Sequence, residues 1–144
     1  MASTGRIYTA LGGKKVLKEA VSHYGTLIEH VRSGLPYAAL EAVAARFEIP
    51  RDDVLRILHV PARTLARRKR ERVFRPDESD RLLRLGRIAA MAEEVLGTRE
   101  KAAAWLQDPN RALGGPRPLD RLDTDLGARQ VEQILGRITH GVHS

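Results

Sequence analysis

Apolar residues recur along this chain at intervals of three and four positions, as they do on one face of an α-helix. The first such stretch runs from Lys14 to Ser33, and its periodic positions are Val16, Leu17, Val21, Tyr24, Leu27, Ile28 and Val31. A second opens at Leu35-Pro36 and ends before Ile49-Pro50, with inward positions Leu40, Val43, Ala44 and Phe47. Both predict amphipathic helices, and Ser33-Gly34 is a plausible stop between them.

Two shorter helices are predicted in the middle of the chain. Residues 51–58 place Val54, Leu55 and Leu58 on one side, and a second helix runs over residues 62–72 with Leu65 as its apolar anchor. A short turn through His59-Val60-Pro61 separates them. Two short helices joined by a tight turn, with Val60 and Leu65 buried, are typical of a helix-turn-helix. His59 stands where such turns often use glycine in the left-handed conformation.

The last part of the chain also has helical periodicity. Pro76, followed by acidic residues, starts the longest predicted helix, which runs to Gly97. Thr98 is the expected N-cap of a short helix through Leu106, and residues 107–118 form a turn-rich connection. Thr124 caps a last helix that carries Ile138 and ends at His140-Gly141. No segment alternates long enough to be a strand, so the predicted fold is all-α.

These elements suggest a division of the chain into three segments. Residues 1–13 are small, polar and glycine-rich, and we expect a mobile tail there. We assign residues 14–75 to a helical N-terminal region that contains the helix-turn-helix at 51–72. Residues 76–144 form a second helical domain.

Positive charge is concentrated in the predicted helix-turn-helix. The chain has a net charge of +7, and residues 51–90 contain twelve Lys and Arg against six Asp and Glu, whereas residues 91–144 contain seven against eight. Arg63, Arg67 and Arg70 fall on one helical face. A basic recognition helix of this kind is expected to meet DNA phosphates and base edges. The candidate DNA-binding residues are Arg63, Thr64, Arg67, Arg68, Lys69 and Arg70. The alternative is a solvated basic helix that binds nothing.

Other functional classes are disfavoured by the composition. The chain has no cysteine, which excludes thiol catalysis and zinc fingers and fits a reducing cytoplasm. It has no signal peptide and no apolar run of membrane-spanning length, so we expect a cytoplasmic protein. Gly114-Gly115 lacks the surroundings of a phosphate loop. No catalytic set or metal-spaced cluster is found, so we expect no enzyme activity, cofactor or metal.

Several segments, in order, resemble one known family. They are Glu78–Ile88, Ala102–Leu106, Pro109–Leu119, Thr124–Val131 and Ile138–Val142. Together they resemble the Xre/MbcA/ParS antitoxins of RES–Xre toxin–antitoxin modules, and Arg63–Arg68 is similar to the Xre-like helix-turn-helix of that family. The resemblance covers about residues 34–143. Arg68 departs from the motif, because an apolar residue that faces inward is usual at its position.

The resemblance implies two partners. The N-terminal part would bind operator DNA and form a homodimer, and the C-terminal part would bind a RES-domain toxin and cover the cleft in which the toxin binds NAD. The complex of toxin and antitoxin would be larger than the dimer. The candidate toxin-binding residues are Gly114, Gly115, Arg117, Asp120, Asp123, Leu126, Gly141, Val142, His143 and Ser144.

An NAD cleft must attract a dianionic pyrophosphate, so we expect cationic groups there that Asp120, Asp123, Asp125 and the terminal carboxylate could meet. Leu126 and Val142 would fill apolar space. The aspartates could instead only cap helices. An alternative for the whole chain is a stand-alone dimeric transcriptional regulator, whose C-terminal domain only dimerises or senses a ligand.

Overall fold

The computed structural model describes residues 2–139. In this range the chain forms helices and short 3-10 turns without a β-sheet, so the all-α prediction is confirmed. The α-helices are α1 (Thr4–Ala10), α2 (Gly13–Leu17), α3 (Tyr24–Ser33), α4 (Tyr37–Phe47), α5 (Arg51–Leu58), α6 (Ala62–Glu71), α7 (Pro76–Leu96), α8 (Arg99–Gln107) and α9 (Asp125–Thr139). The 3-10 turns are η1 (Arg111–Leu113) and η2 (Pro118–Arg121). No helix among the described residues is long and apolar enough to cross a membrane.

The N-terminal segment differs from its prediction. Residues 4–10 form α1, whose Ile7 and Ala10 are buried together with the following Leu11. The expectation of a mobile tail is therefore wrong, because these few apolar residues suffice to dock a short helix against α7 and α4. The helix predicted from Lys14 to Ser33 is also interrupted: α2 ends at Leu17, and α3 begins only at Tyr24. Val21 lies in the connection between α2 and α3 and is buried there, so its apolar spacing does not reflect a helix.

The predicted second helix is confirmed as α4, with Leu40, Val43 and Phe47 buried. A short backbone bridge joins the segment before α4 to the segment after α6. The Tyr37 N–H donates to the carbonyl of Arg72 at 2.9 Å, and the Phe74 N–H donates to the carbonyl of Leu35 at 2.9 Å. Gly34 permits this bridge, since a Cβ there would lie 2.3 Å from the Phe74 carbonyl oxygen. The bridge fixes the end of α6 against the start of α4.

The two short helices of the predicted helix-turn-helix are confirmed as α5 and α6. His59 occupies the left-handed region at φ 58°, as its place in the turn predicts. Val60 and Leu65 are buried at 7% and 2% exposure, so both anchors lie where the pattern places them. Because α6 has so little apolar surface, the turn and the bridge after α6 determine how the helix is held.

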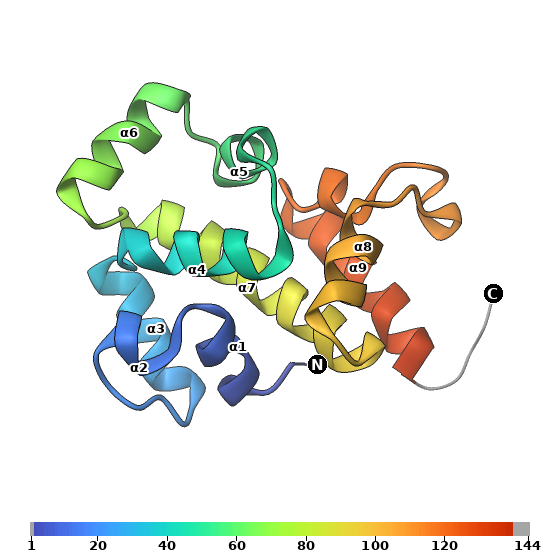
Figure 1. Cartoon of the computed structure of the whole chain (residues 1–144), viewed down its shortest axis with the longest axis horizontal. Coiled ribbons are helices and arrows are strands. Elements are labelled where there is room, and N and C mark those ends of the chain that lie inside the picture. Colours follow the sequence, from blue (N-terminus) through green and yellow to red (C-terminus); the bar gives the residue numbers. More distant parts are fainter. Residues whose placement is uncertain (1, 140–144) are drawn as a thin grey trace.

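The long helix α7 passes through the centre of the molecule and packs against α1, α3, α4 and α5 from the first half of the chain and against α8 and α9 from the second half (Figure 1). Leu82, Leu85 and Ile88 have no exposed surface. Trp105 of α8 is half-buried and packs against the same core, to which Ile134 of α9 also belongs. The two halves of the chain therefore share one helix as a common core element.

Candidate functional surfaces

The exposed face of α6 carries cations that have no acidic partner among residues 2–139. Arg63, Arg67, Lys69 and Arg70 are exposed, and Thr64 is half-buried beside them. Arginines elsewhere are mostly paired: Arg46 forms an ion pair with Glu93 at 2.8 Å, and Arg87 pairs with Glu132. A row of unpaired cations on one short helix is a surface suited to polyanions.

Arg68 does not belong to this face, and the prediction that it contacts DNA is wrong. Its side chain is 5% exposed, and its guanidinium donates to both carboxylate oxygens of Glu78, at 2.6 and 3.0 Å. Glu71 accepts a further hydrogen bond at 3.0 Å. Arg68 occupies the inward position of the helix that an apolar residue usually fills, and its burial is possible because Glu78 at the start of α7 satisfies the charge.

Glu78 also stabilises the beginning of α7. Its carboxylate accepts a hydrogen bond from the backbone N–H of Arg75 at 2.9 Å, which satisfies one of the free donors of the helix end. Burial alone would raise the pKa of Glu78, but the hydrogen bonds from Arg68 and Arg75 lower it below its usual value. The pair therefore stays ionised and joins α6 to α7.

An open groove of about 670 Å³ lies at the start of α9. Three of the predicted partner-binding residues, Asp120, Asp123 and Leu126, line it. Leu126 is 79% exposed, the most exposed of the large apolar side chains in residues 2–139. The other lining residues are Arg121, Thr124, Gly127, Arg129, Gln130 and Gln133. The groove combines one apolar protrusion with amide and charged groups.

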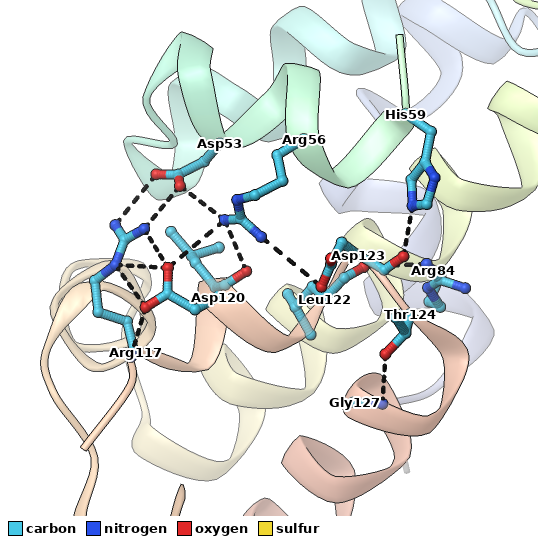
Figure 2. Close-up of polar contacts among 11 residues, drawn as sticks. Asp53, Arg56, His59, Arg84, Arg117, Asp120, Leu122, Asp123, Thr124 and Gly127 are labelled. Carbon is cyan, nitrogen blue, oxygen red and sulfur yellow. Dashed lines mark hydrogen bonds and ion pairs between the residues drawn. The ribbon is translucent and has the colours of Figure 1, made fainter. Parts of the chain in front are cut away.

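Arg117 does not line this groove; its guanidinium lies between Asp53 of α5 and Asp120 of η2 (Figure 2). Its guanidinium donates to Asp53 at 2.7 and 3.2 Å, and to Asp120 at 2.6 Å. Arg56 completes the cluster, with a hydrogen bond of 2.9 Å to Asp53 and one of 3.1 Å to the Leu119 carbonyl. This cluster of Asp53, Arg56, Arg117 and Asp120 fastens the helix-turn-helix to the C-terminal part.

The cluster keeps both carboxylates ionised. Burial opposes the ionisation of Asp53, but hydrogen bonds from Arg117 and Arg56 hold its pKa below the usual value. The hydrogen bond from Arg117 likewise lowers the pKa of Asp120, against a smaller effect of burial. Both carboxylate oxygens of Asp120 are occupied by Arg117, through its guanidinium and its backbone N–H. Asp120 is therefore mainly a structural residue of η2.

Two further contacts hold the segment that leads into α9. The His59 Nε2–H donates to the carbonyl of Asp123 at 2.6 Å, and Arg84 of α7 donates to the carbonyl of Leu122 at 3.1 Å (Figure 2). The Thr124 hydroxyl accepts from the Gly127 N–H at 3.0 Å, which confirms the predicted cap of the last helix. The turn of the helix-turn-helix and the rim of the groove are thus in direct contact.

The remaining candidate residues are not brought into the groove. Gly114 and Gly115 form an exposed turn after η1, with positive φ angles of 82° and 118°. Gly141, Val142, His143 and Ser144 lie outside the described residues. The sequence reasoning missed Gln130 and Gln133, which follow Leu126 by four and seven positions and so share its helical face. That spacing was a usable signal. No sequence signal pairs Asp53 with Arg117.

Comparisons with known proteins cover both parts of the chain. Residues 26–87 match the model of the antitoxin Xre-like helix-turn-helix domain, and residues 91–141 match the antitoxin Xre/MbcA/ParS C-terminal toxin-binding domain. The chain is 32% identical to an antitoxin Xre of Yersinia enterocolitica over 120 residues, which are 82% of this chain and 81% of that protein. It is 34% identical to an antitoxin Xre of Photorhabdus laumondii over 79% of this chain and 78% of the relative. An antitoxin Xre of Pseudomonas putida is 43% identical over 83 residues, 57% of this chain and 52% of that one.

Proposed function

Because the chain belongs to the Xre/MbcA/ParS family of antitoxins, which act by binding and not by catalysis, we propose that it inhibits a cognate RES-domain toxin and represses its own operon. The toxin would consume NAD, and the antitoxin would cover the cleft in which NAD binds. A homodimer would present two α6 helices to an operator in the cytoplasm. Toxin and antitoxin together would form a larger complex.

The observation that carries the proposal is the exposed Leu126 at the rim of the groove. Covering a large apolar side chain that is 79% exposed would lower the free energy of a complex with a protein partner. It lies within the matched toxin-binding domain, among side chains that supply polar contacts. One apolar anchor with a polar rim is the usual composition of a protein–protein interface.

The electrostatics of the groove refine the expectation about the aspartates. Asp120 is already neutralised by Arg117, so it has little charge to offer a cationic cleft. Asp123 is freer, since its carboxylate lies 3.9 Å from Arg56, whereas that of Asp120 lies 2.6 Å from Arg117. We therefore assign Leu126 and Asp123 the contacts with the toxin and Asp120 a supporting role. The contribution of residues 141–144 stays a prediction from the sequence.

The α6 face supports the second activity. Its unpaired cations Arg63, Arg67 and Arg70 follow one another along the exposed side of a helix-turn-helix. A recognition helix with this composition is suited to phosphates and to the acceptor edges of guanine. The α6 cations and the residues that line the groove belong to different segments of the chain, 62–71 and 120–133, so substitutions can address the two activities separately.

Two binding experiments test the proposal. The chain is titrated with the protein encoded by a neighbouring RES-type reading frame, and separately with duplex DNA from the region upstream of its own gene. We expect both to bind, and we expect Arg63→Ala with Arg67→Ala to weaken only the DNA titration. A chain that binds DNA but never the neighbouring protein would favour the alternative, a stand-alone dimeric regulator.

A further inference from the structure

A second cationic surface continues from the C-terminal end of α6. An open groove of about 460 Å³ lies between α2, the start of α4 and the end of α6. Four cations line it: Lys15 of α2 and Lys18 directly after it, and Lys69 of α6 and Arg72 directly after it. All four side chains are exposed, and none has an acidic partner within the described part of the chain. Glu41 is the acidic residue on the groove, which we call the α2–α6 groove.

Two of these cations share one backbone conformation. Lys18 is the C-cap of α2 and Arg72 that of α6, and both adopt the left-handed conformation with φ 68°. Glycine is the residue that takes this position without strain, and a long cationic side chain stands there in both cases. Glu48 and His59 adopt the same conformation, so it provides a substitution for the test, and the charges define the surface.

We propose that the α2–α6 groove binds the phosphate backbone of the DNA duplex whose bases α6 reads. A recognition helix that enters the major groove has the sugar–phosphate strands beside its ends, so cations beyond the end of α6 meet phosphates and not bases. Tyr37 adds a hydroxyl to the same groove, and its ring is fixed by stacking on Phe74 at a centroid distance of 5.4 Å. This inference rests on the DNA-binding activity proposed above and extends the contacted surface to α2.

Charge and position favour DNA over the other possible occupants. All residues that line the groove lie between Lys15 and Arg72, outside the matched toxin-binding domain at 91–141. A second copy of the same surface would bring four cations against four, which is unfavourable. A polyanion that already runs along α6 is the occupant that the charges fit.

The test replaces both strained cations, in the variant Lys18→Gly with Arg72→Gly. Glycine relieves the left-handed positions, so the thermal midpoint should equal or exceed that of the wild type, and lost binding cannot be attributed to unfolding. Loss of two phosphate contacts should make the negative slope of log K against log salt shallower by about two units. The affinity should fall by about ten- to a hundredfold near 0.1 M salt. The loss should be the same for the upstream duplex and for a scrambled duplex, because phosphates carry no sequence information.

A matched control removes the same net charge elsewhere. Lys101→Ala with Arg111→Ala takes away two exposed cations of the C-terminal part, and its salt slope should stay at the wild-type value. Glu41→Gln should have the opposite effect, since removal of the acidic residue from the groove should raise the affinity for both duplexes. An unchanged slope in the glycine variant, or equal losses in variant and control, would overturn the proposal.

The outcomes also separate this inference from the proposed function. If Arg63→Ala with Arg67→Ala weakens DNA binding but the glycine variant does not, α6 alone binds DNA and the α2–α6 groove has no part in it. If the wild type binds neither duplex, both proposals fail. If the glycine variant loses toxin binding or self-association and keeps its DNA affinity, the groove belongs to a protein partner and the inference is wrong.

Discussion

Replacing Arg117 by Met should destabilise the chain, because it removes the centre of the cluster that joins α5 to η2. The Asp53 side chain is 9% exposed, whereas those of Arg117 and Asp120 are 29% and 37% exposed. Loss of one partner from a fully buried pair costs about 3–5 kcal/mol. Here Arg56 still faces Asp53, and solvent screens Asp120. We therefore expect the free energy of unfolding to fall by about 2–3 kcal/mol.

The assay is thermal or urea unfolding of the full chain near pH 7. A loss of this size should lower the melting temperature by about 6–10 °C for a chain of this length. Arg129→Met is the matched control, since the Arg129–Asp125 pair has a similar distance of 2.9 Å but side chains that are 71% and 61% exposed. The control should change the stability by less than about 0.5 kcal/mol.

The pH dependence of the stability is an independent test of the contribution that Asp53 and Asp120 make through Arg117. The pKa values of Asp53 and Asp120 are lowered in the folded chain, so their contribution is fully present above the unfolded values of about 4. That contribution is lost as the pH falls through the lowered folded values. The difference in stability between wild type and Arg117→Met should therefore shrink in acid below about pH 4. Equal melting temperatures at pH 7, or a difference that grows in acid, would refute the role assigned to the cluster.

Three further predictions concern other parts of the chain. Arg68→Ala should reduce the stability by about 3–5 kcal/mol in urea unfolding, because it leaves Glu78 buried without a partner, and it should leave the salt slope of DNA binding unchanged once folding is complete; a wild-type melting curve would contradict this. Trp105→Ala should cost about 2–3 kcal/mol, less than for a fully buried ring, since the side chain is half-buried, and a melting temperature within a degree of wild type would show that the ring packs against nothing. Deletion of residues 141–144 should release NAD consumption by the bound toxin without affecting folding or DNA binding, and full neutralisation by the truncated chain would assign inhibition to the groove at residues 120–133 alone.

The helical periodicity predicted most of this fold. The positions of α4 to α9, the left-handed His59 and the buried Val60 and Leu65 all follow from local spacing and capping residues. The sequence failed where burial depends on distant neighbours. Ile7 and Leu11 stand in a glycine-rich segment too short for a period, and Val21 keeps the apolar spacing across a connection that is not helical.

The candidate sites could be predicted less completely, because their contacts also depend on residues that are distant in the sequence. Exposed cations of α6 can be recognised from the sequence, because the charge is concentrated in one short helix. Arg68 was recognised as unusual, but its partner Glu78 follows a turn and a bridge that no local pattern reveals. Arg117 and Asp53 are 64 positions apart, so only the packing of η2 on α5 brings them together.

We expect the groove at the start of α9 to hold the toxin inactive, and the rate of NAD loss reports on this inhibition. NAD consumption by the purified RES-type partner is followed at equimolar chain, with wild type and with Leu126→Asp. The substitution puts a charge on a side chain that is 79% exposed, so the fold and the DNA affinity should be unaffected. We predict that the wild type stops NAD loss and that Leu126→Asp does not. Full protection of NAD by Leu126→Asp would contradict this inhibitory role of the groove, as would continued NAD loss in the presence of the wild type.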